Sequence, residues 1–425
     1  MTARRVLLRA LLGLLVLLAL LAAGVVALNL RGEDPVGDMR AEDFVASPGQ
    51  VERGRYLALA GNCAGCHTAR GGAAYAGGRG IETPFGTIYT GNLTPEPLTG
   101  IGLWNADHFW RAMHNGRSRD GRLLYPAFPY TSFTQMTRED SDAIYAWLRT
   151  LPPVAQANRA HTLAFPYDTQ AALGVWRAIF FTPGRFEPQP QRSAEWNRGA
   201  YLVGGPGHCI ACHGSRNSLG ATDTARGLVG GMLPGENWYA PALDAASEAG
   251  VAGWDTQQVV TLLKTGRTAR ASVLGPMADV VYRSTQYLSD ADLRAMAVYL
   301  QALPQAPPPA AAPPGRRNDV VLRRGETIYA QQCAWCHGER GEGVAGAFPP
   351  LAGNRAVNMR HTSNLVQVVR RGGFLPATEG NPQPYGMPPF GHLLDDADIA
   401  AVLSYVRANW GNTGAEVTQR EAMQR

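Results

Sequence analysis

The stretch that decides the fold reads Cys63-Ala64-Gly65-Cys66-His67, and its pattern recurs as Cys209-Ile210-Ala211-Cys212-His213 and Cys333-Ala334-Trp335-Cys336-His337. The three copies use all six cysteines of the 425-residue chain. C-x-x-C-H is the sequence pattern by which c-type haem is attached. Two thiols on one helical turn can form thioether bonds to the haem vinyl groups, and the adjacent histidine then faces the iron as its proximal ligand. The sequence therefore predicts three covalently bound haem c groups with iron ligands His67, His213 and His337.

Other uses of paired cysteines fit the spacing less well. A zinc ribbon places two C-x-x-C units about 15 to 20 residues apart, whereas these motifs begin 146 and 124 residues apart (209 − 63 and 333 − 209). A thioredoxin-like dithiol needs a βαβ context, and no run of β-branched residues surrounds any motif. A disulfide framework is typical of short secreted chains, so the length of this chain argues against one.

Each motif lies in the same local order, which indicates duplication into three repeats. A short helix with a glycine and an aromatic residue precedes the cysteines, and an amphipathic helix opened by acidic residues closes each repeat. The first helices contain Arg53-Gly54-Arg55-Tyr56, Arg198-Gly199-Ala200-Tyr201 and Arg324-Gly325-Glu326-Thr327-Ile328-Tyr329, and the closing helices are expected over 140–148, 290–300 and 396–406. In the first two repeats Trp104-Asn105 and Trp254-Asp255 introduce one more helix, and the third repeat lacks that tryptophan.

These repeats predict the fold class. We expect an all-α protein of three tandem class I cytochrome c domains, over 48–152, 194–304 and 318–411, after an N-terminal transmembrane helix over 1–30. The segment 304–314 is a proline-rich, semi-rigid spacer. The formal net charge of +5 is spread along the chain, and no basic run interleaved with aromatic residues indicates nucleic-acid binding.

A Gly/Pro-rich loop follows each motif and is expected to orient the proximal histidine. A ligating histidine usually donates its other ring N–H to a backbone carbonyl or similar group, which fixes its tautomer and direction. The prolines that could turn such a carbonyl toward the ring are Pro84, Pro241 and Pro350.

The sixth iron ligands are expected to be methionines, because electron-transfer haems commonly pair His with Met. Met277 and Met387 lie shortly before the closing helices of the second and third repeats. In the first repeat Phe128 stands where the methionine is expected, and phenylalanine cannot bind iron. Met136 is our candidate there, with Met113, His114 or an open iron site as alternatives. The other histidines (His108, His161, His208, His361 and His392) show no metal-site spacing and are expected to be structural.

The amino terminus is predicted to be a membrane element. Arg4, Arg5 and Arg9 precede an uncharged apolar stretch over 10–28, and about 20 apolar residues span a bilayer. The arginines predict a cytoplasmic amino end, which places the haem domains in the periplasm. Cleavage near Ala22-Ala23-Gly24 is the alternative, because a signal peptide has a similar layout.

The long joint over 151–195 contains the apolar run 173–181, which is too short to span a bilayer. It either clamps the first domain to the second or forms a surface for a partner subunit or the membrane.

With these residues in view, the chain from about Val51 to Trp410 resembles the three-haem cytochrome c subunit of bacterial membrane-bound dehydrogenases. The resemblance is carried by strings beyond the haem motifs, namely Gly91-Asn92-Leu93-Thr94-Pro95, Thr99-Gly100-Ile101-Gly102, Leu124-Tyr125-Pro126-Ala127, Trp196-Asn197-Arg198-Gly199-Ala200-Tyr201-Leu202-Val203 and Gly207-His208-Cys209. It implies an electron-transfer subunit at the bacterial cytoplasmic membrane. Its partners would be a catalytic flavin, quinone or molybdenum subunit as electron donor, and ubiquinone or another cytochrome as acceptor.

Two departures refine this expectation. Partners of quinoprotein alcohol dehydrogenases often carry methionine at the position of Phe128 and a longer carboxyl tail. The present chain instead looks more like subunits paired with molybdenum-dependent aldehyde or heterocycle dehydrogenases. Two other functions stay open from the residues alone: a haem enzyme with an open iron site in the first domain, and a free-standing carrier. No catalytic residue is predicted within this chain.

Overall fold

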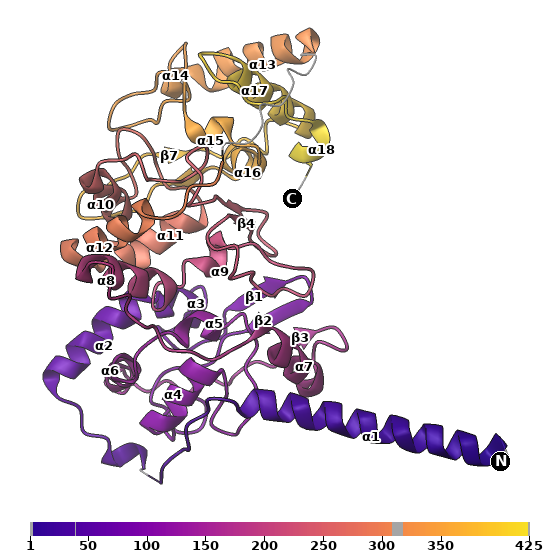
Figure 1. The fold of residues 1–425 in the computed structure, drawn as a ribbon. Coiled ribbons are helices and arrows are strands. Elements are labelled where there is room, and N and C mark those ends of the chain that lie inside the picture. The colour runs from indigo at the N-terminus through magenta and orange to yellow at the C-terminus, as the bar shows by residue number, and fades with distance from the viewer. Residues whose placement is uncertain (1–2, 39, 308–317, 424–425) are drawn as a thin grey trace. The chain divides into compact units, whose positions relative to one another are not determined.

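The computed structural model describes the chain except for residues 1–2, 39, 308–317 and 424–425 (Figure 1). The described residues form two compact units. The first unit comprises Met1–Arg55 and His67–Glu187, and the second comprises Tyr56–Cys66 and Pro188–Arg425. The second unit therefore contains two complete haem motifs and the cysteines of the first motif. The predicted spacer over 304–314 lies largely outside the described residues.

The chain is mainly helical, as predicted (Figure 1). Up to residue 187 the elements are α1 (Ala3–Leu30), η1 (Ala41–Asp43), α2 (Pro48–Ala60), α3 (Cys63–His67), β1 (Gly80–Thr83), β2 (Gly86–Tyr89), α4 (Ala106–Asn115), α5 (Tyr130–Phe133), α6 (Arg138–Leu148), β3 (Thr162–Leu163) and α7 (Gln170–Phe180). From residue 188 they are α8 (Ala194–Gly204), α9 (Ile210–His213), β4 (Gly231–Met232), β5 (Tyr239–Ala240), α10 (Thr256–Thr265), α11 (Pro276–Arg283), η2 (Thr285–Tyr287), α12 (Asp290–Gln301), α13 (Asp319–Gln332), α14 (Ala334–His337), α15 (Arg355–Asn358), α16 (Ser363–Arg371), β6 (Gly373–Phe374), β7 (Gly386–Met387), α17 (Asp396–Ala408) and α18 (Gln419–Ala422).

Short antiparallel strands add to the helices, and the all-α prediction did not include them. In the first unit β1 pairs with β2 and β2 with β3, with Gly80 opposite Tyr89. In the second unit β4 pairs with β5, and β6 pairs with β7. The pairs β1–β2 and β4–β5 lie in the loops that follow the first two haem motifs, whereas β3 comes from the segment after α6 and β6–β7 lies between α16 and α17. They shape these connections without forming a core of their own.

Each repeat is built on one helix pair that meets at a glycine. The pairs are α2 with α6, α8 with α12 and α13 with α17. A Cβ atom built on Gly54 would overlap the carbonyl of Ala143, one on Gly199 the carbonyl of Ala295, and one on Gly325 the carbonyl of Ala401. Because no side chain larger than hydrogen fits between the two backbones, this glycine sets the approach of the helices in all three repeats.

An arginine stands directly before each glycine and forms an ion pair across the same two helices. The arginine donates its Nε to an aspartate at the third position of the closing helix, in the pairs Arg53–Asp140 (2.6 Å), Arg198–Asp292 (2.8 Å) and Arg324–Asp398 (2.7 Å). The backbone N–H of each aspartate is in turn bound by the helix N-cap residue, which is Thr137, Ser289 or Asp395. The cap and the ion pair therefore locate the start of the closing helix against the first helix.

The extra helix of the first two repeats begins where the sequence predicts. Asn105 caps α4 by accepting from His108 N–H (2.9 Å), and Asp255 caps α10 by accepting from Gln257 N–H (2.9 Å). Left-handed glycines end both helices, Gly116 at φ 59° and Gly266 at φ 78°. In the third repeat α16 has no side-chain cap, which agrees with the divergence seen in the sequence.

The glycine crossing yields a stability prediction. Gly199→Ala should force α8 away from α12 and destabilise the protein by about 1–3 kcal/mol, the usual cost of inserting a methyl group into a packed interface. Gly49→Ala is the matched control, because Gly49 lies in α2 and no atom comes within 4 Å of the place that its methyl group would take. Unfolding of the haem-loaded protein in denaturant, followed by circular dichroism, should show a lower midpoint for the first variant only. Equal midpoints would show that the crossing tolerates a methyl group.

Candidate functional site

The three motifs each form a single turn of helix placed directly after the first helix of the repeat. These turns are α3, α9 and α14, and all six cysteines are free of disulfide bonds. Asn62 (φ 47°) and His208 (φ 38°), which precede the first two motifs, adopt left-handed backbone, a conformation that Asn and His accept more readily than most residues. The sharp turn presents both thiols of a motif from one helical turn, as two thioether bonds require.

The proximal histidines are oriented alike. The ring Nδ1 lies 2.7 Å from Gly91 O in His67, 2.7 Å from Pro241 O in His213 and 3.0 Å from Pro349 O in His337. A carbonyl oxygen only accepts, so each Nδ1 must donate, and Nε2 is left with its lone pair. Burial lowers the pKa of all three imidazoles. The neutral ring with a free Nε2 is the form that binds iron.

The predicted source of these carbonyls was correct in one repeat and wrong in two. Pro241 is confirmed. Pro84 is wrong because it lies at the turn between β1 and β2, and the hairpin moves the accepting carbonyl on to Gly91. Pro350 is wrong by one residue, since Pro349 supplies the carbonyl.

A buried hydrogen-bond network holds the Gly91 carbonyl in place, and the sequence alone did not assign it a role. Asn92 is almost fully buried. Its side chain donates to Val154 O (2.8 Å) and accepts from Thr94 N–H (2.9 Å). Since a buried amide that loses its partners costs free energy, this network keeps the loop beside His67 in one conformation. The signal in the sequence for this network is the string Gly91-Asn92-Leu93-Thr94-Pro95, which contains both Asn92 and Thr94.

In the second repeat the accepting loop is held by the third repeat. Asn364 of α16 pairs with the backbone of Tyr239, accepting from its N–H (2.8 Å) and donating to its carbonyl (2.7 Å). His361 stacks on the Tyr239 ring with centroids 3.9 Å apart. Tyr239 stands two residues before Pro241, so these contacts steady the carbonyl that orients His213.

Residues 56–66, which lead into the first motif, are joined to the second repeat. The hydrogen bonds run from Tyr56 Oη to Asp292 (2.6 Å), from Ser284 Oγ to Ala60 O (3.1 Å) and from His208 Nε2 to Gly61 O (3.1 Å). His208 precedes Cys209, and Gly61 lies two residues before Cys63. The segments that carry the cysteines of the first two motifs therefore contact each other through a side chain.

The candidate sixth ligands occupy different settings. Met136 is fully buried between α5 and α6, and its backbone is fixed by a bond from Met136 N–H to Phe133 O (2.9 Å). The residues Tyr130–Phe133 before it form the helical turn α5. Met277 lies in the first turn of α11, not on a loop, and packs against Val281 and its neighbours. Met387 is half-buried on β7. All three stay predictions as ligands.

The alternatives in the first repeat are also buried. Met113 and His114 lie on α4. His114 donates Nδ1 to Thr134 O (2.8 Å) and stacks on Trp110 with centroids 4.4 Å apart. Phe128, which stands where a methionine ligand was expected, packs against Phe133 with ring centroids 5.4 Å apart.

These features together fit covalent haem. Burial raises the pKa of Cys63 and Cys209 to about 12 and that of Cys333 to about 11, which suits thiols at the edge of an apolar cofactor site. Among the described residues, no three or more His, Cys, Asp or Glu side chains gather as a conventional metal site would require. The repeated turn, the paired thiols and the oriented imidazole define a c-type cytochrome.

Comparison with known proteins agrees with this class. A cytochrome c family model matches residues 51–152 and 322–410. The chain is 40% identical over 404 residues to the cytochrome c subunit of alcohol dehydrogenase (quinone) from Gluconacetobacter polyoxogenes, covering 90% of this chain and 86% of that protein. It is 35% identical over 394 residues to the gluconate 2-dehydrogenase cytochrome c subunit of Pantoea cypripedii, covering 88% and 89%. The chain therefore belongs to the cytochrome c family, in the group of dehydrogenase cytochrome c subunits.

A further relative differs in length. The chain is 43% identical over 366 residues to a nicotinate dehydrogenase subunit of Pseudomonas putida, covering 85% of this chain but 30% of that longer protein. The family model and the cytochrome c subunits named above together imply that this chain binds haem and carries electrons.

The first repeat yields a spectroscopic prediction. If Met136 binds the iron held by His67, Met136→Leu keeps the side-chain volume and removes the sulfur. One haem should then become high-spin and bind carbon monoxide after reduction. The measurement is optical and electron paramagnetic resonance spectroscopy of the purified protein.

Met113→Leu is the matched control, since Met113 is similarly buried in the same repeat. If the spectrum is unchanged in Met136→Leu but changes in Met113→Leu, Met113 is the sixth ligand of the iron held by His67. A parent protein that already binds carbon monoxide would indicate an open iron site.

Proposed function

We propose that the chain holds three haem c groups, bound through Cys63 and Cys66, through Cys209 and Cys212, and through Cys333 and Cys336. A bound haem c supplies a site that takes up and releases one electron. The proposal is supported by one observation above all: the motif turn and the Nδ1–carbonyl bond occur in all three repeats. The chain's own contribution is to hold each imidazole neutral and aimed, and to surround the site with apolar side chains.

The proposal includes three domains, over 48–152, 194–304 and 318–411. The family model matches the first and third of these ranges and leaves the second unmatched. The second repeat nevertheless has the same glycine crossing, the same Arg–Asp pair and the same histidine orientation. These shared contacts support counting it as a third cytochrome c domain.

In this proposal the chain carries electrons from a catalytic dehydrogenase subunit to ubiquinone or another cytochrome. The names of the relatives support the donor, because they are cytochrome subunits of alcohol, gluconate and fructose dehydrogenases. The donor could be of flavin, quinone or molybdenum type. The similarity to the nicotinate dehydrogenase subunit and the phenylalanine at position 128 favour an N-heterocycle or aldehyde dehydrogenase as partner.

The proposed location is the outer face of the bacterial cytoplasmic membrane, with α1 as the anchor. This 28-residue helix is the one described helix that is long and apolar enough to cross a membrane, although a signal sequence passes the same test. Its apolar side chains are largely exposed. The three arginines at its beginning support a cytoplasmic amino end, and covalent haem attachment in the periplasm agrees with that orientation.

The haem count is directly testable. We predict three haems per chain that stay with the polypeptide after acid-acetone extraction, measured by the pyridine haemochrome spectrum against protein mass. Replacing both Cys209 and Cys212 by Ala should lower the count to two. A parent count of two or fewer in matured protein would contradict the proposal.

The partner is tested separately. A chain tagged at its carboxyl end and purified from its native membrane should retain a dehydrogenase subunit whose flavin, quinone or molybdenum cofactor mass spectrometry and metal analysis can identify. Recovery of the chain alone under mild detergent conditions, with full haem content, would instead favour a free-standing carrier.

A further inference from the structure

Helix α7 has its charge inside and its apolar side chains outside. Its one charged residue, Arg177, is 2% exposed and donates to Asn29 Oδ1 (2.9 Å). The outer face presents Val175 and Ile179, which are 47% and 64% exposed, one helical turn apart. A surface helix of a water-soluble protein has the opposite arrangement, with its charges toward solvent. The outer face of α7 is therefore unsuited to water.

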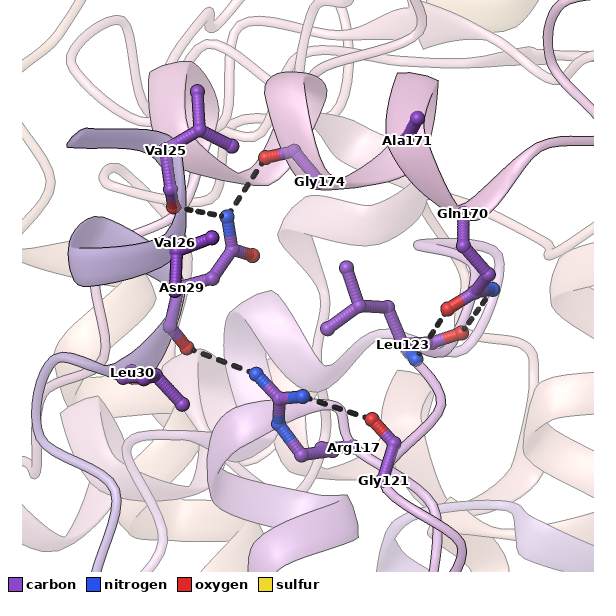
Figure 2. Close-up of a pocket in the computed structure, with 10 residues that line it drawn as sticks. All are labelled: Val25, Val26, Asn29, Leu30, Arg117, Gly121, Leu123, Gln170, Ala171 and Gly174. Atoms are coloured by element: carbon purple, nitrogen blue, oxygen red, sulfur yellow. Dashed lines mark hydrogen bonds between the residues drawn. The ribbon is translucent and has the colours of Figure 1, made fainter. Parts of the chain in front are cut away.

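Helix α7 is fastened to the end of α1, as the ribbon shows (Figure 1). Asn29, in the last turn of α1, donates to Gly174 O (2.8 Å), as Figure 2 shows. Arg31 follows α1 and donates to Thr182 Oγ1 (2.8 Å), just beyond α7. Because one contact is with the middle of α7 and the other with the residues just after it, the helix keeps a fixed position beside the last turns of α1.

The position of α7 corresponds to one surface of the bilayer that α1 would cross. If Arg9 lies at the cytoplasmic surface, residues 10–29 form a helix about 30 Å long at about 1.5 Å per residue. The hydrocarbon core of a bilayer is also about 30 Å thick. The far surface then falls near Asn29, the residue that binds α7. The exposed apolar side chains of α7 thus belong to a helix that packs against α1 at this level.

A cavity of about 300 Å³ lies between the two helices at the same level (Figure 2). Its polar side chains are committed to internal partners. Asn29 binds Val25 O and Gly174 O, Arg117 binds Gly121 O and Asn29 O, and Gln170 pairs with the backbone of Leu123. What remains for an occupant is apolar wall from Val26, Leu30 and Leu123. Such a cavity suits a hydrocarbon chain better than a charged or hydrogen-bonding group.

We propose that α7 lies on the outer leaflet of the membrane, with Val175 and Ile179 in contact with lipid, and that the cavity beside α1 receives the part of a lipid acyl chain nearest its headgroup. This inference rests on the proposed membrane location of α1. It makes α7 a second, interfacial contact that holds the first unit against the bilayer. Lipid is favoured over a partner protein because α7 packs against the proposed membrane helix at the level of the bilayer surface.

The test uses the full-length, haem-loaded protein in phosphatidylcholine vesicles. A lipid-soluble diazirine is photolysed there, and labelled residues are located by mass spectrometry. We expect labelling at Val175 and Ile179 as well as along α1. Leu98 is the internal control, since it is 88% exposed on the first unit and should stay unlabelled. Val175→Asp/Ile179→Asp should abolish labelling of the helix, while Leu98→Asp leaves it unchanged.

Each outcome has a distinct meaning. Labelling of α1 without labelling of α7, combined with modification of Val175 by a water-borne reagent, would overturn the inference. Protection of α7 from both reagents in the complete dehydrogenase complex would also overturn it, because a protein subunit would then cover the face. Absence of label on α1 itself would show that the proposed anchor fails, which is a separate result. If the aspartate variant does not fold, the labelling of the parent protein still decides.

Discussion

The close contact of two helix backbones at a glycine is the constraint on which each repeat depends. Gly54, Gly199 and Gly325 face the carbonyls of Ala143, Ala295 and Ala401, so the helices can touch without intervening side chains. The motif turn begins within about three helical turns of each glycine. A shift of the first helix would therefore move both cysteines and the histidine together. The adjacent Arg–Asp pair adds a directional contact to this steric one, which explains why arginine and glycine occur side by side in all three repeats.

Contacts that are local in sequence could be predicted well. The starts of the extra helices at Trp104-Asn105 and Trp254-Asp255 and the acidic starts of the closing helices depend on neighbouring residues, and the structure reproduces them. The carbonyls that orient the histidines were harder, because they come from loops 12 to 28 residues away. In the first repeat Pro84 lies in the turn of the β1–β2 hairpin, and the carbonyl that accepts from His67 belongs to Gly91, just after the hairpin. Loop geometry depends on long-range hydrogen bonds such as those of Asn92, and no local pattern reports them.

The sixth ligands illustrate a different limit. Methionine is a flexible apolar residue that fills core gaps as readily as it binds iron, so its presence near a site is weak information. Met277 lies on a helix and Met387 on a strand, although both stand shortly before a closing helix in the sequence. Position in the chain therefore indicates a candidate, whereas the sulfur-to-iron bond is a matter for spectroscopy.

The hydrogen bonds of residues 56–66 bear on how this chain can be divided. The repeats suggest three separable modules, and a cut in the long joint after residue 152 would be the obvious way to isolate the first. That cut would break three hydrogen bonds between the first and second repeats. They are Tyr56 to Asp292, Ser284 to Ala60 and His208 to Gly61. A cut at the proline-rich spacer would have its own cost, because it would remove Asn364 and His361 from Tyr239 and so release the loop that orients His213. The three repeats are therefore alike in sequence, but no single repeat can be cut out with all of its contacts intact.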